Sequence, residues 1–161
     1  MIPTGKILPL PRLLEALAPH RAAGKRVALA NGLFDLLHVG HLRYLEASRT
    51  EADLLVVAIN SDTSARALKG PTRPIVPEAE RAELVAGFAC VDHVTLFGEA
   101  SVEAVMRALH PDVHCKGTDY TLQTVPEREI ARELGIRIAI VGDPKEHATR
   151  DLVARIRDLE G

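Results

Sequence analysis

The residues best suited to chemistry lie in one short segment, Asn31-Gly-Leu-Phe-Asp-Leu-Leu-His-Val-Gly-His41. This segment directly follows the apolar run Val27–Ala30, which predicts a buried strand, then a loop, then a helix that begins with two histidines three positions apart. Residues at this spacing lie on one face of a helix. A helix N-terminus also presents unpaired N–H groups and a positive dipole end, so it attracts anions. The segment therefore predicts a polyphosphate site, and with it an enzyme that acts on a nucleotide.

Two glycines shape this segment. Gly32 is expected to permit a tight or left-handed turn after the strand. Gly40 leaves no side chain between His38 and His41, so a phosphate or a flat base could approach the helix closely. A glycine in a first helical turn is often simply tolerated, but its place between two histidines favours a function here.

The histidine pair has two other interpretations, a chance surface pair at helical spacing and a pair that shares a metal ion. A closed zinc site needs further ligands at suitable spacing. The remaining histidines are scattered, and the sequence contains no HExxH motif. The loop–helix context therefore favours phosphate binding over both alternatives.

Short apolar runs alternate with helical patterns along the chain. Most of the runs are apolar at consecutive positions, as in strands buried on both faces. Because helical segments separate them, helical crossovers must join parallel strands, and the pattern predicts an open α/β sheet. The predicted strands are Val27–Ala30, Leu54–Ile59, Val94–Leu96, Val113–Cys115 and Ile136–Val141.

Several predicted helices have recognisable ends. Gly24 would stop a helix over Arg12–Ala23, and Pro77 suits the first turn of a helix that runs through Phe88. Thr124 and Glu127 have capping-box spacing before Ile130–Leu134. Thr149 or Asp151 is expected to cap the last helix, whose apolar residues should face inward: Leu152, Val153, Ile156 and Leu159.

Polar residues follow four of the predicted strands, in the segments Asn31–His41, Asn60–Asp62, Lys116–Tyr120 and Gly142–Thr149. In open α/β sheets, ligands bind beyond the carboxyl ends of the strands. The convergence of four loops on one edge supports the site prediction more strongly than any single motif does.

Length and composition restrict the class of protein. The 161 residues fit one domain over residues 1–161, with residues 1–24 as an N-terminal helical extension. The 20 basic residues nearly balance the 22 acidic ones and aromatics make up 3%, so neither nucleic acid nor a membrane is an expected partner. With no signal peptide, no membrane-spanning stretch and two cysteines without pairing spacing, a cytoplasmic location is expected.

The motifs also resemble a known family. Phe34-Asp-Leu-Leu-His-Val-Gly-His41 resembles the HxGH signature of the nucleotidylyltransferase (cytidylyltransferase-like) superfamily. The likeness runs from about Lys25 to the last helix, and it implies a single-domain, Rossmann-like, doubly wound parallel sheet of five strands. Four further blocks, in the right order, resemble the adenylyltransferase domain of the bacterial ADP-heptose synthases: Asn60-Ser-Asp62, Leu68-Lys-Gly-Pro-Thr-Arg-Pro74, Glu80-Arg81 and Lys116-Gly-Thr-Asp-Tyr120.

The resemblance implies a reaction and its reactants. A sugar 1-phosphate, with heptose 1-phosphate as the expected acceptor, would attack ATP and yield an ADP-sugar and pyrophosphate. An acceptor phosphate is already an anion near neutral pH because its second pKa is about 6, so direct in-line attack needs no general base. Mg²⁺ would be carried by the nucleotide phosphates, with no metal held by side chains. The family also implies a homo-oligomer, a dimer or larger.

The resemblance further assigns roles to residues of this chain. Many of these residues also have a purely structural interpretation, such as a loop aspartate that bonds its own backbone or an exposed helix arginine. Catalytic phosphate contacts are expected from His38, His41 and Lys116. Nucleotide-binding residues would be Asn31, Gly32, Leu33, Phe34, Gly40, Gly117, Asp119 and Thr149. Acceptor-binding residues would be Asp35, Asn60, Asp62, Lys69, Arg73 and Arg81.

One segment departs from the family pattern. The last helix of the family usually opens with a Ser/Thr-rich turn that grips the β- and γ-phosphates, whereas this chain reads His147-Ala-Thr-Arg-Asp151. Ala148 lacks an expected hydroxyl, while Thr149 and Arg150 could supply part of the grip. Two alternatives therefore stay open. One is the same fold with other substrates, CTP with glycerol or ethanolamine phosphate or ATP with FMN. The other is a nucleotide-binding sensor without turnover.

Overall fold

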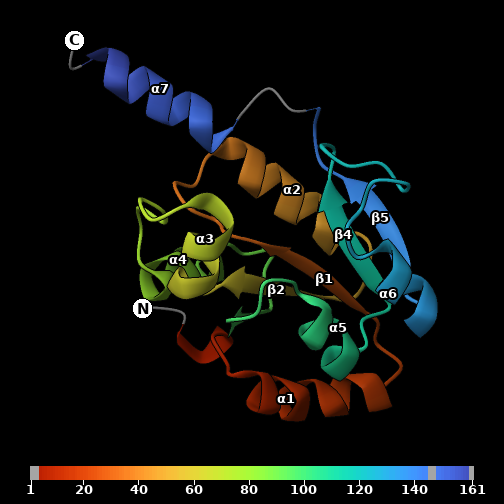
Figure 1. Ribbon diagram of the computed structural model, residues 1–161. Helices are drawn as coiled ribbons and strands as arrows, with labels where there is room; N and C mark the ends of the chain where they lie inside the picture. Colours follow the sequence, from red (N-terminus) through yellow and green to blue (C-terminus); the bar gives the residue numbers. More distant parts are fainter. Residues whose placement is uncertain (1–3, 145–147, 160–161) are drawn as a thin grey trace.

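The computed structural model describes residues 4–144 and 148–159, which form a five-stranded parallel sheet flanked by helices (Figure 1). The strands lie in the order β3-β2-β1-β4-β5, and every neighbouring pair is parallel. The predicted Rossmann-like, doubly wound α/β fold is therefore confirmed. The strands are β1 (Val27–Gly32), β2 (Leu54–Asn60), β3 (His93–Phe97), β4 (Val113–Gly117) and β5 (Arg137–Val141).

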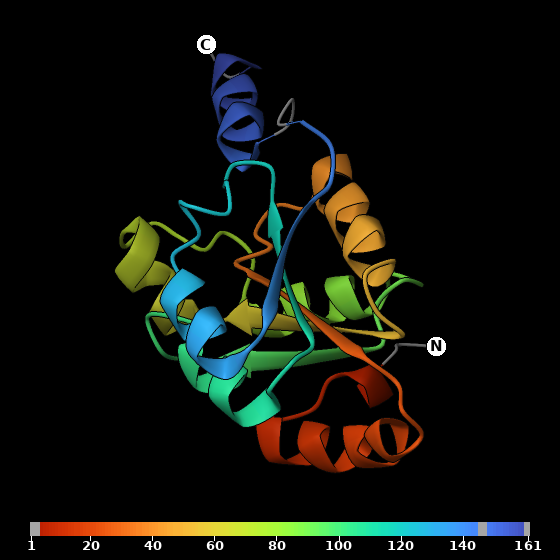
Figure 2. The same cartoon turned by 90° about the vertical axis from the view of Figure 1, so that its right-hand side faces the viewer.

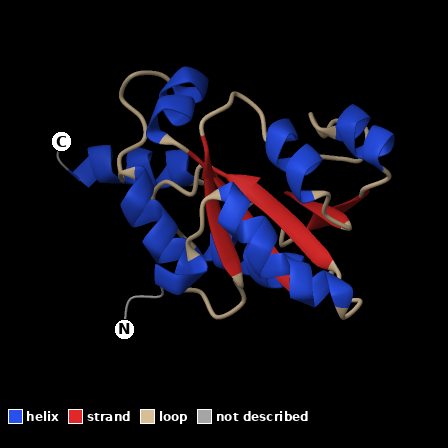
Figure 3. Ribbon diagram, turned by 90° about the horizontal axis from the view of Figure 1, so that it is seen from below, coloured by secondary structure: helices blue, strands red, loops and turns tan. Residues whose placement is uncertain are grey.

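The helices cover both faces of the sheet, as Figures 2 and 3 show from two further directions. Helices α2 and α4 pack on one face, and α1, α5 and α6 pack on the other. The helical elements are η1 (Thr4–Lys6), α1 (Leu10–Ala22), α2 (Val39–Arg49), α3 (Asp62–Lys69), α4 (Glu78–Ala86), α5 (Glu103–Leu109), α6 (Arg128–Leu134) and α7 (Thr149–Leu159).

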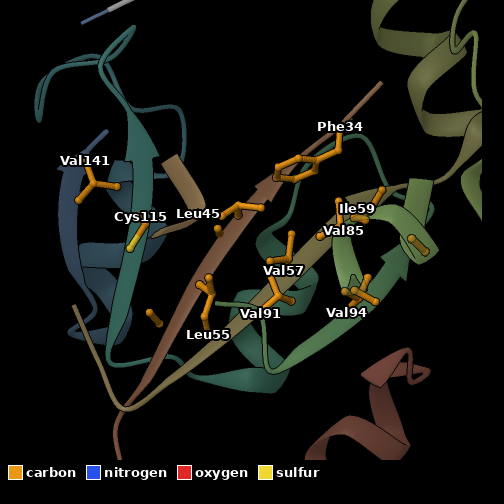
Figure 4. Packing of buried hydrophobic residues seen from close by; sticks show 14 of the residues in the cluster. Phe34, Leu45, Leu55, Val57, Ile59, Val85, Val91, Val94, Cys115 and Val141 are labelled. Carbon is orange, nitrogen blue, oxygen red and sulfur yellow. The ribbon is translucent and has the colours of Figure 1, made fainter. Parts of the chain in front are cut away.

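Strand β2 shows why the sequence has consecutive apolar runs. All of its residues are buried, and alternate side chains enter two separate cores. Leu55, Val57 and Ile59 join the core beneath α2 and α4, which Figure 4 shows from close by. The intervening side chains join the core beneath α1 and α5. A strand with helices on both sides must be apolar at every position rather than at every second one.

The strand order reverses between β1 and β4. From β1 the chain winds outward through β2 to β3, and from β4 it winds the other way to β5. Parallel α/β sheets bind ligands in the crevice outside the carboxyl ends of the strands at such a point. The β1–α2 and β4–α6 loops both begin there, so the fold brings two of the predicted loops together.

The predicted capping box between Thr124 and Glu127 is wrong. Helix α6 begins at Arg128, and its N-cap residue Glu127 makes no side-chain capping hydrogen bond. The Thr124 hydroxyl instead accepts a hydrogen bond from the backbone N–H of Thr121 at 2.8 Å, within the preceding turn. Glu127 turns inward and is buried beside Lys116, with 3.4 Å between its Oε2 and the Lys116 ammonium.

The predicted inward packing of the last helix is also wrong. Helix α7 has no buried residue, and Ile156 and Leu159 are 53% and 85% exposed. Five other helices already cover the two faces of the sheet, and α7 instead projects from the rim near α2 (Figures 1 and 2). Thr149 is the first helical residue rather than its cap, because the carbonyl of Ala148 accepts the backbone N–H of Asp151.

Other predicted helix ends differ by a few residues. Helix α1 begins two residues before the predicted Arg12, and Gly24, at φ +77°, follows its end as expected. Pro77 lies just before α4 rather than in its first turn. Within the described residues, no helix has the length and apolarity needed to span a lipid bilayer.

Candidate active site

A cavity of about 570 Å³ opens at the carboxyl edge of the sheet. Its walls come from the β1–α2 loop, the start of α2, the loop after β4, the loop after β5, the first residues of α7 and the α3–α4 segment. Eleven residues predicted from the sequence line it: Leu33, Phe34, Asp35, His38, Gly40, His41, Lys69, Arg73, Gly117, Asp119 and Thr149. The fold therefore brings most of the predicted site to one concave surface.

The rings of the two histidines lie side by side at the N-terminus of α2, and each accepts a backbone hydrogen bond there. The Nδ1 atom of His38 accepts a hydrogen bond from the backbone N–H of Gly40 at 3.2 Å. The Nδ1 atom of His41 accepts one from the backbone N–H of His38 at 3.3 Å. Their ring centroids are 4.1 Å apart. When Nδ1 of a neutral imidazole accepts a hydrogen bond, the ring proton is on Nε2. These two hydrogen bonds therefore assign both rings as Nε2–H donors.

His41 stays neutral at physiological pH. Burial lowers the pKa of His41 from 6.5 to about 4, and the neighbouring His38 adds to the effect. The ring of Phe34, 5.5 Å from that of His41, forms part of this apolar environment. A neutral imidazole that donates from Nε2 can hydrogen-bond a phosphate oxygen without first losing or gaining a proton.

The β1–α2 loop adopts an unusual backbone conformation. Phe34 and Leu36 have φ values of +51° and +39°, a region that non-glycine residues rarely adopt. The prediction that Gly32 makes the left-handed turn is wrong, because its φ is not positive. A Cβ atom at Gly32 would lie 3.2 Å from the Phe34 ring, so its small size leaves room for that side chain. Non-glycine residues in this region cluster at functional sites.

The Asp35 carboxylate fastens the α3–α4 segment to this loop. It accepts hydrogen bonds from the backbone N–H groups of Ile75 and Val76, and it pairs with the Arg73 guanidinium at 2.8 Å. Burial pushes the pKa of Asp35 upward, but these hydrogen bonds and the charge of Arg73 outweigh it and lower the pKa below 3.8. Asp35 and Arg73 were both predicted to bind the acceptor, and the structure shows them bound to each other at the cavity wall.

Arg81 lies away from the cavity, in contrast to its predicted acceptor contact. Its side chain is fully buried, and its guanidinium donates to the carbonyl oxygens of Leu33, Asn60 and Val76. It also pairs with Asp62 at 2.9 Å. Arg81 therefore joins the β1–α2 loop to the end of β2 and to the start of α4. This geometry supports a structural role in shaping the site.

Five other predicted residues do not line the cavity, one of which is Gly32 beside the Phe34 ring. Asn60 is buried and donates from its amide to the Ser64 hydroxyl at 2.9 Å, while Asp62 pairs with Arg81. Asn31 and Lys116 lie side by side behind the cavity, with 3.5 Å between the side-chain oxygen Oδ1 of Asn31 and the Lys116 ammonium. In each case the partner comes from a distant or adjacent element that sequence spacing did not reveal.

The cavity also contains residues that the sequence prediction missed. Arg43 pairs with Asp143 at 2.8 Å, and the hydroxyl of Tyr44 donates to the carbonyl of Cys115 at 2.8 Å. Gly142 adopts φ +93°, and a Cβ atom there would lie 3.3 Å from the Cα of Tyr44. A glycine that follows a buried strand was the available signal for this close approach of β5 and α2. Thr118, Val141 and Pro144 complete the missed set.

The start of α7 forms one end of the cavity. Ala148, Thr149 and Arg150 line it, and the Thr149 hydroxyl donates to the carbonyl of Asp35 at 3.3 Å. The Arg150 side chain is 83% exposed and lies 3.6 Å from the Asp151 carboxylate. His147, the first residue of the segment that departs from the family pattern, lies outside the described residues.

The fold, the paired histidines and the anion-attracting helix start are features of a nucleotidyltransferase. Comparisons with known proteins agree: the family model "Cytidylyltransferase-like" matches residues 29–153. The chain therefore belongs to the cytidylyltransferase-like family, and the predicted nucleotidyltransferase class is confirmed.

Individual members of the family are similar to this chain over most of its length. The chain is 41% identical over 146 residues to the bifunctional protein HldE of Syntrophotalea carbinolica, covering 91% of this chain and 30% of that protein. It is 41% identical over 156 residues to HldE of Geobacter sulfurreducens, covering 97% of this chain and 32% of that protein. The chain thus spans about a third of the length of these relatives.

A solved structure shows the same architecture. The lipopolysaccharide core biosynthesis protein of Thermoplasma volcanium superposes with a TM-score of 0.65 and 28% sequence identity. The match covers 75% of this chain and 99% of the other. It supports the nucleotidyltransferase fold independently of the longer bifunctional relatives.

Proposed function

We propose that this chain transfers an adenylyl group from ATP to a sugar 1-phosphate, with heptose 1-phosphate as the acceptor. An oxygen of the acceptor phosphate forms a bond to the α-phosphorus of ATP, and the bond from that phosphorus to the bridging oxygen of the β-phosphate breaks. The products are ADP-heptose and pyrophosphate. The observation that carries this proposal is the position of His38 and His41, which place two Nε2–H donors at a helix N-terminus on the cavity wall.

The chemistry fits such donors. Direct phosphoryl-group transfer needs no covalent intermediate, and its catalysis consists of positioning plus stabilisation of charge on the phosphate oxygens. His38 and His41 would contact the α- and β-phosphates as that charge increases. The low pKa of His41, about 4, keeps it a neutral donor across the physiological range.

The other walls suggest where the remaining parts of the substrates bind. Gly117, the last residue of β4, and Asp119, two residues further on, would meet the ribose. Thr149 and Arg150 would lie near the departing pyrophosphate. Lys69, the last residue of α3, and Arg73 lie on the wall built by the α3–α4 segment. Their positive charges support a role as the acceptor-phosphate clamp, and the carboxylate of Asp35 orients Arg73 for it.

We propose that Mg²⁺ enters the site bound to the phosphates of the nucleotide. Across residues 4–144 and 148–159, no group of three or more His, Cys, Asp or Glu residues could hold a metal ion. Mg²⁺ prefers oxygen ligands and commonly binds through substrate phosphates. Bound to the nucleotide, it would neutralise charge on the leaving group.

A pyrophosphate-release assay tests the proposal. The protein and Mg²⁺ would be incubated with ATP or CTP and a panel of phosphorylated acceptors that includes heptose 1-phosphate, glycerol phosphate, ethanolamine phosphate and FMN. We expect release with ATP and heptose 1-phosphate. Product with CTP alone would contradict the proposal and favour a cytidylyltransferase. Nucleotide binding without release across the whole panel would favour a sensor.

Three further predictions accompany this function. We infer that residues 1–161 form one nucleotidyltransferase domain with residues 1–24 as a helical extension, that the protein is cytoplasmic, and that it forms a dimer or larger homo-oligomer without nucleic acid. Light scattering coupled to size-exclusion chromatography tests the assembly. A mass of 17.5 kDa at micromolar concentration would exclude a homo-oligomer.

A further inference from the structure

A buried ion pair lies behind the cavity, between β4 and α6. The Lys116 ammonium lies 3.4 and 3.5 Å from the two carboxylate oxygens of Glu127, and the side chains of the pair are only 9% and 8% exposed. The ammonium also lies 3.5 Å from the side-chain oxygen Oδ1 of Asn31 and 4.8 Å from the centre of the Tyr120 ring. Groups from β1, from the turn after β4 and from the start of α6 therefore surround one buried cation.

The strand geometry explains why Lys116 does not enter the cavity. Cys115 packs into the core beneath α2, which is the helix that carries the histidines. Side chains alternate between the two faces of a strand, so His114 and Lys116 point to the opposite face, where α6 packs. His114 joins the same cluster through Asn31, with 3.0 Å between its Nε2 and the side-chain oxygen Oδ1 of Asn31.

The backbone connects Lys116 directly to one wall of the cavity. Gly117, Thr118 and Asp119 follow Lys116 directly, and all three line the cavity. Lys116 is the last anchored side chain before this turn, and Tyr120, at the other end of the turn, places its ring over the same ammonium. Glu127 does not line the cavity, but its carboxylate is the counter-charge that keeps the Lys116 ammonium in this place.

We propose that Glu127 is a positioning residue for nucleotide binding, acting through the Lys116 ammonium on the turn formed by residues 117–120. The inference rests on the proposed function only in taking this cavity as the nucleotide site. An uncompensated ammonium in a buried site must seek water or another partner. Loss of the Glu127 charge would therefore displace Lys116, and with it the turn that contacts the nucleotide.

The main test compares Mg·ATP binding by the full chain and by its Glu127→Gln variant, measured by calorimetry without any acceptor. The substitution keeps the shape and removes the charge. We expect the Kd for Mg·ATP to rise roughly tenfold, which corresponds to a loss of about 1.4 kcal/mol of binding free energy. In turnover, the KM for ATP should rise by a similar factor while kcat and the KM for the acceptor change less than twofold.

Glu129→Gln is the matched control. Glu129 lies in the first turn of α6, is exposed and pairs with Arg132 at 3.0 Å on the helix surface. The same chemical change there should leave the Kd for Mg·ATP unchanged. A general loss of helix stability would reduce the active fraction of both variants without a selective rise in Kd.

A second variant covers the case in which Glu127→Gln does not fold. Tyr120→Leu removes the ring above the ammonium and leaves the ion pair intact, and Tyr120 is only half-buried. We expect a smaller rise in Kd, of about two- to fivefold, because a cation–π contact is weaker than a buried charge pair.

Three results would overturn the inference. The first is an unchanged Kd in folded Glu127→Gln, and the second is an unchanged Kd in folded Tyr120→Leu. The third is a pair of results: a Lys116→Met variant loses turnover while its Kd for Mg·ATP is unchanged, and the Glu127→Gln variant retains turnover. Lys116 would then act directly on the reacting phosphates. If the unaltered chain binds no Mg·ATP at all, the proposed nucleotide site itself is wrong, so the two failures are distinguishable.

Discussion

Two regions surround the cavity and are held in place in different ways. Beneath it lies a buried polar layer formed by Asp35, Arg81, His114, Lys116 and Glu127, each of which is at most 7% exposed when the whole residue is counted. Above it lies a rim in which Arg43, Asp143 and Arg150 are exposed and Ala148 and Thr149 are half-buried. Buried polar groups must be fully paired, whereas exposed ones exchange partners with water at little cost. The buried layer should therefore set the geometry of the site, and the rim should tolerate change.

The largest expected loss of unfolding free energy follows from substitution of Arg81. Arg81→Met leaves Asp62 without its cation and three carbonyl oxygens without a donor. Removal of one partner from a buried charge pair costs about 3–5 kcal/mol, so the free energy of unfolding should fall by that amount. Urea denaturation followed by circular dichroism measures it. A loss below about 1 kcal/mol would mean that this layer does not hold the fold as described.

A smaller loss is expected for Asp35→Asn, which removes the charge that Arg73 and two backbone N–H groups bind. Hydrogen bonds to charged groups contribute about 1.5–3 kcal/mol each, and an amide can still accept from one donor, so we expect a net loss of about 2–3 kcal/mol.

The pH dependence checks the same residue. Because the pKa of Asp35 is lowered in the folded protein, its contribution is present above about pH 4 and is lost as the pH falls through the folded value. The unaltered protein should therefore lose stability more steeply than Asp35→Asn below pH 4. Parallel acid profiles would contradict the assignment.

His114 gives a different pH window. Burial, reinforced by the charge of Lys116, lowers its pKa from 6.5 to about 3. The unfolded chain takes up a proton below about pH 6.5 while the folded chain does not, so stability falls as the pH falls from 6.5 towards 3. This residue alone should cost about 2 kcal/mol at pH 5 relative to pH 7. Urea titrations of His114→Leu should show an acid slope that is shallower by that amount, and an unchanged slope would contradict it.

The smallest effect is expected at the rim. Arg43 and Asp143 form an ion pair at 2.8 Å, but their side chains are 48% and 54% exposed. Exposed pairs contribute about 0–1 kcal/mol, so Arg43→Met should change the free energy of unfolding by less than about 0.5 kcal/mol. A loss as large as that of Asp35→Asn would remove the distinction between the two regions.

The sequence revealed the parts of this site that depend on local pattern. Consecutive apolar residues in β2 predicted a strand covered on both faces, and the spacing of His38 and His41 predicted a helix start. Both depend on residues within one turn or one strand of each other, where periodicity is a reliable guide. Four strand-end loops could also be assigned to one edge, because parallel strands all end there.

Side-chain pairs between residues far apart in the chain could not be predicted from the sequence. Asp35 meets Arg73 across 38 positions, and Arg81 meets Leu33 across 48. An arginine is ordinarily an exposed residue, and the carbonyl oxygens and the Asp62 carboxylate around Arg81 make its burial possible. Lys116 was expected at the phosphates although its neighbour Cys115 is the residue facing α2, a distinction that depends on strand register. The exposure of α7 likewise depends on where the other helices pack.

The most direct test of the account is the turnover of His41→Ala, measured as pyrophosphate release at saturating ATP and acceptor. We predict a fall in kcat of roughly 10²–10³-fold, the size expected when one transition-state donor is lost. The unfolding free energy should fall by no more than about 2 kcal/mol, since a helix-capping contact and the ring contacts with Phe34 and His38 are removed. His110→Asn, at an exposed helix end with φ +49°, serves as the control and should keep full activity. A folded His41→Ala variant with near-normal turnover would contradict the central role of the histidine pair.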